Sequence, residues 1–136
     1  MKLLQSTFAL VLSILISQGC AGELENAERF AECPPGFVEK LFQQKCAGIC
    51  HTGEMPEADL DLTSAGVADR LLMQVSTSDA CNGIPILDPN GTSQLFMNKL
   101  SDSPTCGARM PFGGAALGVR DIECVRRWVE NLTGAP

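Results

Sequence analysis

The chain contains seven cysteines in 136 residues, and an apolar N-terminal stretch decides how they are used. Lys2 precedes an apolar run from Leu3 to Ile16, which is too short for a comfortable permanent membrane span. This pattern predicts a secretory signal peptide over residues 1–20. Six cysteines follow it: Cys33, Cys46, Cys50, Cys81, Cys106 and Cys124. In an oxidising compartment thiols form disulfides or other covalent bonds, so we expect one small, cross-linked domain.

Cys20, at the end of the signal, has the position of the lipidated cysteine in a bacterial lipoprotein signal. Ser17 and Gln18 replace the residues usual in such a signal, so ordinary cleavage within residues 19–21 is the alternative. With lipid on Cys20, the acidic segment 21–33 would be a tether from the membrane surface. The sequence therefore predicts an exported protein, lipid-anchored on the periplasmic side of a bacterial membrane.

The charge balance argues against a nucleic-acid partner. Without Lys2 the chain has 9 basic and 16 acidic residues, a net charge of about −7. It has no tyrosine and one tryptophan, and the basic residues form no stripe. Nucleic-acid binding needs a cationic surface, usually with aromatic residues for stacking, so no nucleic-acid binding is expected.

Apolar spacing predicts an all-α fold. Pro34 and Pro35 suit the first turn of a helix, and the residues from Gly36 on repeat at helical spacing, which predicts a helix that leads to Cys46. Short helices are expected from an N-cap at Ser64 to about Met73, and over roughly 93–100. We find no convincing alternation typical of a strand.

The C-terminal helix has the clearest pattern. Its apolar stripe has Trp128 beside it and consists of Ile122, Val125, Val129 and Leu132. Asp121 near the start and Gly134 after the end agree with helix polarity and with a helix stop. Between the two end helices the sequence predicts short helices and ordered loops.

The stretch "KCAGICH", residues 45–51, contains the only histidine. The haem-attachment signature is C-x-x-C-H, whereas three residues separate Cys46 from Cys50 here. Two such cysteines can bond covalently to haem, and His51 can then ligate the iron. One alternative is a zinc site of Cys46, Cys50, His51 and a fourth cysteine, which would require reduced thiolates in an exported protein. The other is a Cys46–Cys50 disulfide in a fold without haem.

A cytochrome often supplies a methionine as the sixth iron ligand. Met55 is too close to His51 in sequence to reach the other haem face easily. Met73 and Met97 belong to helical apolar patterns, where core packing is the expected role. Met110 lies in the Gly/Pro-rich loop "GARMPFGG", where helical packing gives no reason for a methionine. We therefore predict Met110 as the ligand.

These motifs together resemble class I c-type cytochromes: a helix ending in Cys…Cys-His, an Arg-Met-Pro loop, and a C-terminal helix with Trp. The resemblance covers residues 34–132 and is closest to bacterial cytochrome-c-like lipoproteins, through "CGARMPFGG" (106–114) and "DIECVRRWV" (121–129). It implies a class I cytochrome c-like fold with crossed N- and C-terminal helices, in a haem domain over 34–133. It also implies one covalent haem c held by four residues: Cys46, Cys50, His51 and Met110.

The resemblance further implies a pairing for the remaining cysteines. Four cysteines allow three pairings. Since the terminal helices pack in the class I fold, the implied pairs are Cys33–Cys124 and Cys81–Cys106.

The function implied is one-electron transfer to and from redox partner proteins. The protein would need no catalytic residue, because the cofactor carries the redox chemistry. A haem-free, disulfide-rich envelope lipoprotein that acts as a binding or interaction module is the alternative. A haem peroxidase or ligand sensor fits less well, because the chain has no second histidine and no obvious distal acid–base residue.

Overall fold

A computed structural model of the protein describes residues 32–90 and 94–134. The expected signal peptide (1–20), the lipidation site Cys20 and all of the expected tether before residue 32 lie outside these residues. The described residues form helices and loops without a strand, apart from one isolated bridge between Val75 and Pro85. The all-α prediction is confirmed to this extent. No helix in the described ranges is long and apolar enough to cross a membrane.

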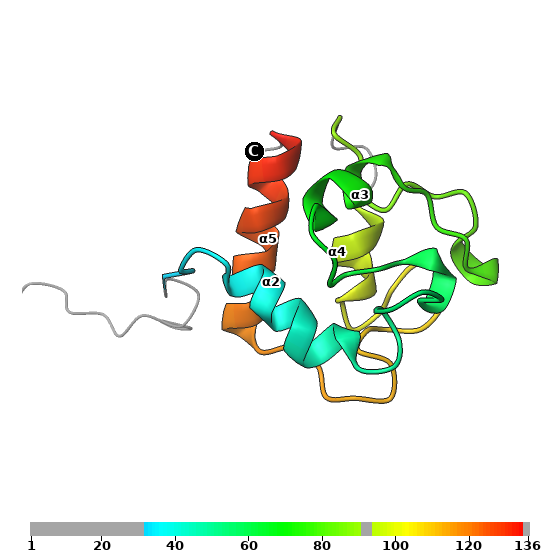
Figure 1. Cartoon of the computed structure of the whole chain (residues 1–136), viewed down its shortest axis with the longest axis horizontal. Coiled ribbons are helices and arrows are strands. Elements are labelled where there is room, and N and C mark those ends of the chain that lie inside the picture. The colour runs from blue at the N-terminus through cyan, green and yellow to red at the C-terminus, as the bar shows by residue number, and fades with distance from the viewer. Residues whose placement is uncertain (1–31, 91–93, 135–136) are drawn as a thin grey trace, which may run out of the picture.

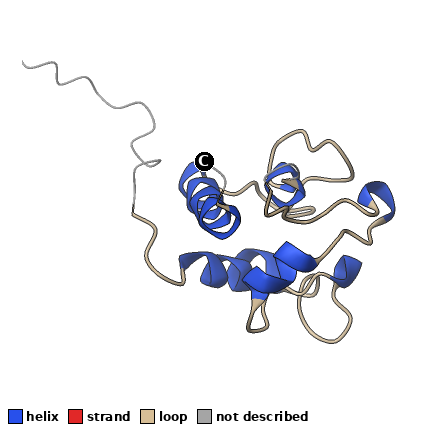
Figure 2. Cartoon of the chain, turned by 90° about the horizontal axis from the view of Figure 1, so that it is seen from above, coloured by secondary structure: helices blue, strands red, loops and turns tan. Residues whose placement is uncertain are grey.

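Seven helical elements follow one another along the described chain (Figure 1). They are α2 (Phe37–Phe42), the π-helical turn η2 (Gln43–Ala47), η3 (Glu57–Asp59), α3 (Val67–Met73), η4 (Asp79–Cys81), α4 (Leu95–Lys99) and α5 (Val119–Thr133). Figure 2 shows that loops connect these short elements over much of the molecule.

Helices α2 and α5 cross and pack against each other, as the two views show (Figures 1 and 2). The buried face of α5 includes Val125 and Val129 from the predicted stripe. Phe42 of α2 makes edge-on ring contacts with Trp128 of α5 and Phe96 of α4, each at 5.6 Å between centroids. Aromatic pairs prefer this arrangement, so Phe42 joins three helices in one core.

The ends of the terminal helices follow the sequence signals in part. The carbonyl of Pro34 accepts a hydrogen bond from the Phe37 amide at 3.0 Å, at the point where α2 begins. Gly134 adopts a left-handed conformation with φ 67° and caps α5, its amide donating to the Glu130 carbonyl at 2.8 Å. The stop at residue 134 agrees with the prediction, whereas Pro34 and Pro35 precede the N-cap Gly36 and do not form the first turn of α2 as predicted.

Two disulfides cross-link this framework, and they are the two pairs that the resemblance implied. Cys33–Cys124 joins the segment before α2 to α5 over a sequence separation of 91 residues. Cys81–Cys106 joins η4 to the loop that leads to Met110, over a separation of 25 residues. In the chain-entropy account, loops of these lengths destabilise the unfolded chain by about 4.6 and 3.5 kcal/mol.

The prediction of Ser64 as a helix N-cap is wrong. Helix α3 begins at Val67, after Gly66 in a left-handed conformation with φ 77°. The Ser64 amide instead donates a hydrogen bond to Oδ1 of Asp61 at 3.1 Å. The Asp61 carboxylate closes a local turn there, which competes with helix formation. The end of the helix at Met73 is as predicted.

Candidate functional site

A cavity of about 440 Å³ lies between the "KCAGICH" segment and the loop that carries Met110. This volume falls within the range of about 300–1,000 Å³ usual for ligand pockets. All four residues predicted as haem anchors and ligands line it: Cys46, Cys50, His51 and Met110. Buried Leu62 and Phe96 form part of its apolar wall. The structure therefore brings the predicted site residues together.

Cys46 lies in the π-helical turn η2, which continues α2. Such turns are rare and occur frequently at functional sites. The side chain packs against the hydrophobic core, and this burial raises the pKa of the Cys46 thiol to about 11. Cys46 is therefore protonated at neutral pH in the metal-free protein.

Cys46 and Cys50 are both free thiols, so the alternative Cys46–Cys50 disulfide is not formed in this structure. The four other cysteines of the described ranges are paired in disulfides, which leaves no further thiolate for a zinc site among them. Nor do any three histidine, cysteine or carboxylate side chains in those ranges form a metal-binding group.

His51 is oriented by the loop that follows it. Its Nδ1 lies 3.1 Å from the carbonyl oxygen of Leu60. A carbonyl oxygen only accepts, so Nδ1 carries the proton and the lone pair is on Nε2. The His51 carbonyl also accepts from the Leu62 amide at 3.0 Å, which fixes the backbone. Metal-binding histidines usually have this partner for their other nitrogen, and it raises the basicity of the ligating one.

The turn around Asp61 holds the Leu60 carbonyl in place. Oδ1 of Asp61 accepts hydrogen bonds from the Thr63 amide at 2.8 Å, the Thr63 hydroxyl at 3.0 Å and the Ser64 amide at 3.1 Å. Hydrogen bonds from Ser64 and Thr63 lower the pKa of Asp61, since they favour its charged form. Arg70 of α3 also donates to the Asp61 carbonyl, at 3.1 Å. The signal in the sequence was "DLTS", an Asp followed by Thr and Ser.

Among the four methionines of the described chain, Met110 alone lines the cavity. Met55 is 93% exposed, and Met97 packs against the core as expected. Met73 is 79% exposed, so the prediction that it packs in the core is wrong. It is the last residue of α3.

Lys99, at the end of α4, was not foreseen as part of the site. It lines the cavity, its Nζ donates to the Cys106 carbonyl at 3.2 Å, and its own carbonyl accepts from the Met110 amide at 2.7 Å. Partial burial lowers the pKa of Lys99, because it disfavours the charged form. No sequence signal marked this residue, since both partners come from the folded loop.

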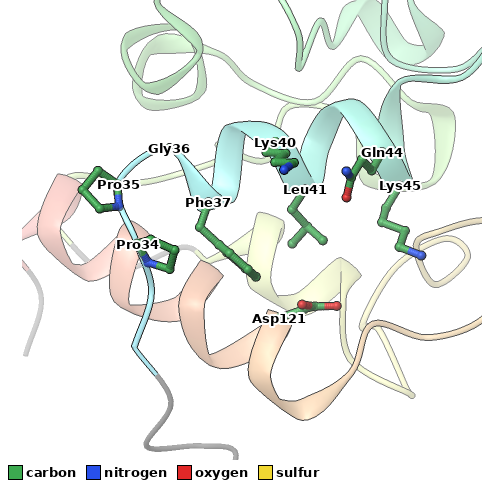
Figure 3. A pocket seen from close by; sticks show the side chains of 9 residues that line it. All are labelled: Pro34, Pro35, Gly36, Phe37, Lys40, Leu41, Gln44, Lys45 and Asp121. Atoms are coloured by element: carbon green, nitrogen blue, oxygen red, sulfur yellow. The ribbon is translucent and has the colours of Figure 1, made fainter.

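A second hollow of about 510 Å³ lies between α2 and the start of α5 (Figure 3). In Figure 3, Phe37 and Leu41 point from α2 towards α5, while Lys40 and Gln44 lie along the outer face of α2. Its lining includes no cysteine, histidine or methionine. The predicted chemistry therefore belongs to the cavity at Cys46 and Met110.

No family model matches this chain, and neither a curated protein nor a solved structure is significantly similar to it. The resemblance to class I c-type cytochromes thus rests on the motifs and on the placement of their residues.

Proposed function

We propose that this protein is an exported c-type cytochrome that transfers single electrons through one covalently bound, His/Met-ligated haem c. The observation that supports this most directly is the shared cavity. Met110 is distant from His51 in sequence, yet both line it together with Cys46 and Cys50. A methionine placed in a loop for another reason would have no cause to meet this motif.

The residues present fit a covalent haem. Two free thiols, an imidazole with its Nδ1 proton bound to Leu60, and a thioether all reach a largely apolar cavity. Each thiol would add to one haem vinyl group: its S–H bond breaks, sulfur bonds to one vinyl carbon, and the proton goes to the other. This addition consumes no oxidant or reductant.

The side chains have separate roles in this proposal. Nε2 of His51 and the sulfur of Met110 would hold the iron, and the soft, neutral sulfur would favour its reduced state. Leu62 and Phe96 form part of the apolar lining, which would lower the local dielectric around a bound haem and so influence its potential. The bound haem supplies the one-electron chemistry, so no residue acts as a catalyst and the protein is a carrier rather than an enzyme.

Location and partners follow from the sequence. Lipid on Cys20 would anchor the protein on the periplasmic side of a bacterial membrane, with residues 21–33 as an acidic tether. The partners would be redox proteins. Without Lys2 the net charge of about −7 would favour partners with a basic docking face, and such steering weakens with salt.

A pyridine haemochrome spectrum tests the function, on protein exported by a host with cytochrome c maturation machinery. We expect one haem per chain with the band position of two thioethers. Protein without haem would contradict the proposal and leave the haem-free envelope lipoprotein as the better description. Carbon monoxide binding by the reduced protein would instead indicate an open sixth position, as in a sensor or peroxidase.

A further inference from the structure

A tight turn lies inside the C-x-x-x-C-H motif. The Cys50 amide donates to the Ala47 carbonyl at 2.8 Å, which closes a β-turn with Gly48 and Ile49 at its centre. Gly48 has φ 40° and ψ −123°. These angles are near those of the first central residue of a type II′ turn, which is usually glycine because a Cβ opposes that conformation.

The turn directs the middle of the motif away from the cavity. Ile49 is 96% exposed and is not part of the cavity lining, whereas Cys46, Cys50 and His51 are. The Ala47 carbonyl also accepts from the His51 amide at 3.1 Å. The Ala47 carbonyl thus fixes the backbone of both Cys50 and His51.

We propose that Gly48 is a positioning residue for haem attachment. The Gly48–Ile49 turn accommodates the additional residue of the motif by extruding Ile49, so that both thiols and His51 reach one cavity. This inference rests on the proposed function. A Cβ at Gly48 would meet nothing within 4 Å, so the effect of a substitution comes from the backbone conformation and not from crowding.

The formation of two thioethers should depend on Gly48 only while Ile49 is present. Deletion of Ile49 leaves Cys-Ala-Gly-Cys-His, the C-x-x-C-H spacing, which does not need the extruding turn. A merely structural glycine would be equally sensitive in both backgrounds. The deletion therefore separates a role in positioning the thiols from a general role in stability.

The test compares four variants with the wild type: Gly48→Ala, deletion of Ile49, the two changes combined, and Gly83→Ala. Gly83 is the matched control, because it also has a positive φ (78°) and open space around a Cβ. Pyridine haemochrome spectra and intact mass count thioethers, and far-UV circular dichroism with disulfide mapping reports folding. We expect mostly single-thioether product in Gly48→Ala and two thioethers in the other three variants.

The outcomes separate the two proposals. Two thioethers at wild-type yield in Gly48→Ala would overturn the role of Gly48 and leave the cytochrome assignment intact. A single thioether in the combined variant would overturn it too, even if Gly48→Ala alone fails to fold. Wild-type protein without covalent haem would overturn the proposed function, and this inference with it.

Discussion

The amide of Met110 donates a hydrogen bond to the carbonyl oxygen of Lys99 at 2.7 Å, joining the loop that carries Met110 to the end of α4. The Lys99 ammonium also donates to the Cys106 carbonyl at 3.2 Å, and Cys106 is bonded to Cys81. The segment from Cys106 to Met110 is thereby held at both ends. In the proposed cytochrome, this restraint would keep the Met110 sulfur within reach of the iron.

Met110→Leu should remove the weak near-infrared charge-transfer band of Met–Fe(III) in the oxidised protein. The reduction potential should fall, because a soft neutral sulfur is lost from the iron. The fold should persist at a cost below about 1.5 kcal/mol, since leucine and methionine have similar volumes. Near-infrared absorption and protein-film voltammetry measure the two effects.

Met73→Leu and Met97→Leu are the controls for that substitution. Met73 is exposed and Met97 packs against the core outside the cavity, so neither change should alter the band or the potential. If one of these variants loses the band while Met110→Leu keeps it, the assignment of the ligand is wrong.

His51→Ala should abolish stable haem incorporation, because the chain has no other histidine to ligate the iron. Cys46→Ala or Cys50→Ala should leave at most a single-thioether product. Intact mass after export by a host with maturation machinery gives the haem content of each variant. Normal covalent haem in His51→Ala would rule out His51 as the proximal ligand.

Lys99→Met should loosen the loop over residues 106–110 while keeping the hydrogen bond from the Met110 amide to the carbonyl of residue 99. It removes the hydrogen bond to the Cys106 carbonyl, and a hydrogen bond to a charged donor contributes about 1.5–3 kcal/mol. Because Lys99 is only half-buried, we expect the lower part of this range for the loss in free energy of unfolding. Urea denaturation measures the loss, and the near-infrared band should weaken.

Lys45→Met is the matched control for Lys99→Met, because Lys45 lines the same cavity but is exposed on η2. It should leave the free energy of unfolding within about 0.5 kcal/mol of the wild type. An equal loss in both variants would show that the bond to Cys106 has no special importance.

Features encoded locally were predictable from the sequence. The apolar stripe of α5 follows from helical spacing, and Gly134 marks its end. The sequence also distinguished Met110 from the methionines in helical patterns, because it lies in a Gly/Pro-rich loop. The signals for these features lie within a few residues of one another.

Features that depend on which of several possible hydrogen bonds or ion pairs the folded chain forms were not predictable. Helix α3 begins later than predicted because the Asp61 carboxylate competes with the helix for local hydrogen bonds. Lys99 acquires its role only when the 106–110 loop folds back onto α4. Glu123 of α5 is buried and ion-paired with Arg126 and Arg127 of the same helix, which the apolar stripe alone does not indicate.

The Asp61 carboxyl should make the stability of the turn over residues 61–64 depend on pH in the acid range. Its pKa is lowered in the folded protein by hydrogen bonds from Ser64 and Thr63, relative to about 3.9 in an unfolded chain. A carboxyl with a lowered folded pKa contributes stability that is fully present above its unfolded pKa. That stability is lost as the pH falls below about 3.9 towards the folded pKa.

The substitution Asp61→Asn should remove this contribution at neutral pH and flatten the change in urea midpoint between pH 7 and pH 3. Asp69→Asn, on the exposed face of α3, is the control and should keep the wild-type pH profile. Since the Asp61 turn carries the Leu60 carbonyl that binds Nδ1 of His51, Asp61→Asn should also weaken the restraint on the imidazole. Hydrogen exchange at the Leu62 amide, which donates to the His51 carbonyl, should become faster in that variant. Unchanged exchange at Leu62 together with an unchanged pH profile would show that the Asp61 turn does not hold His51 in place.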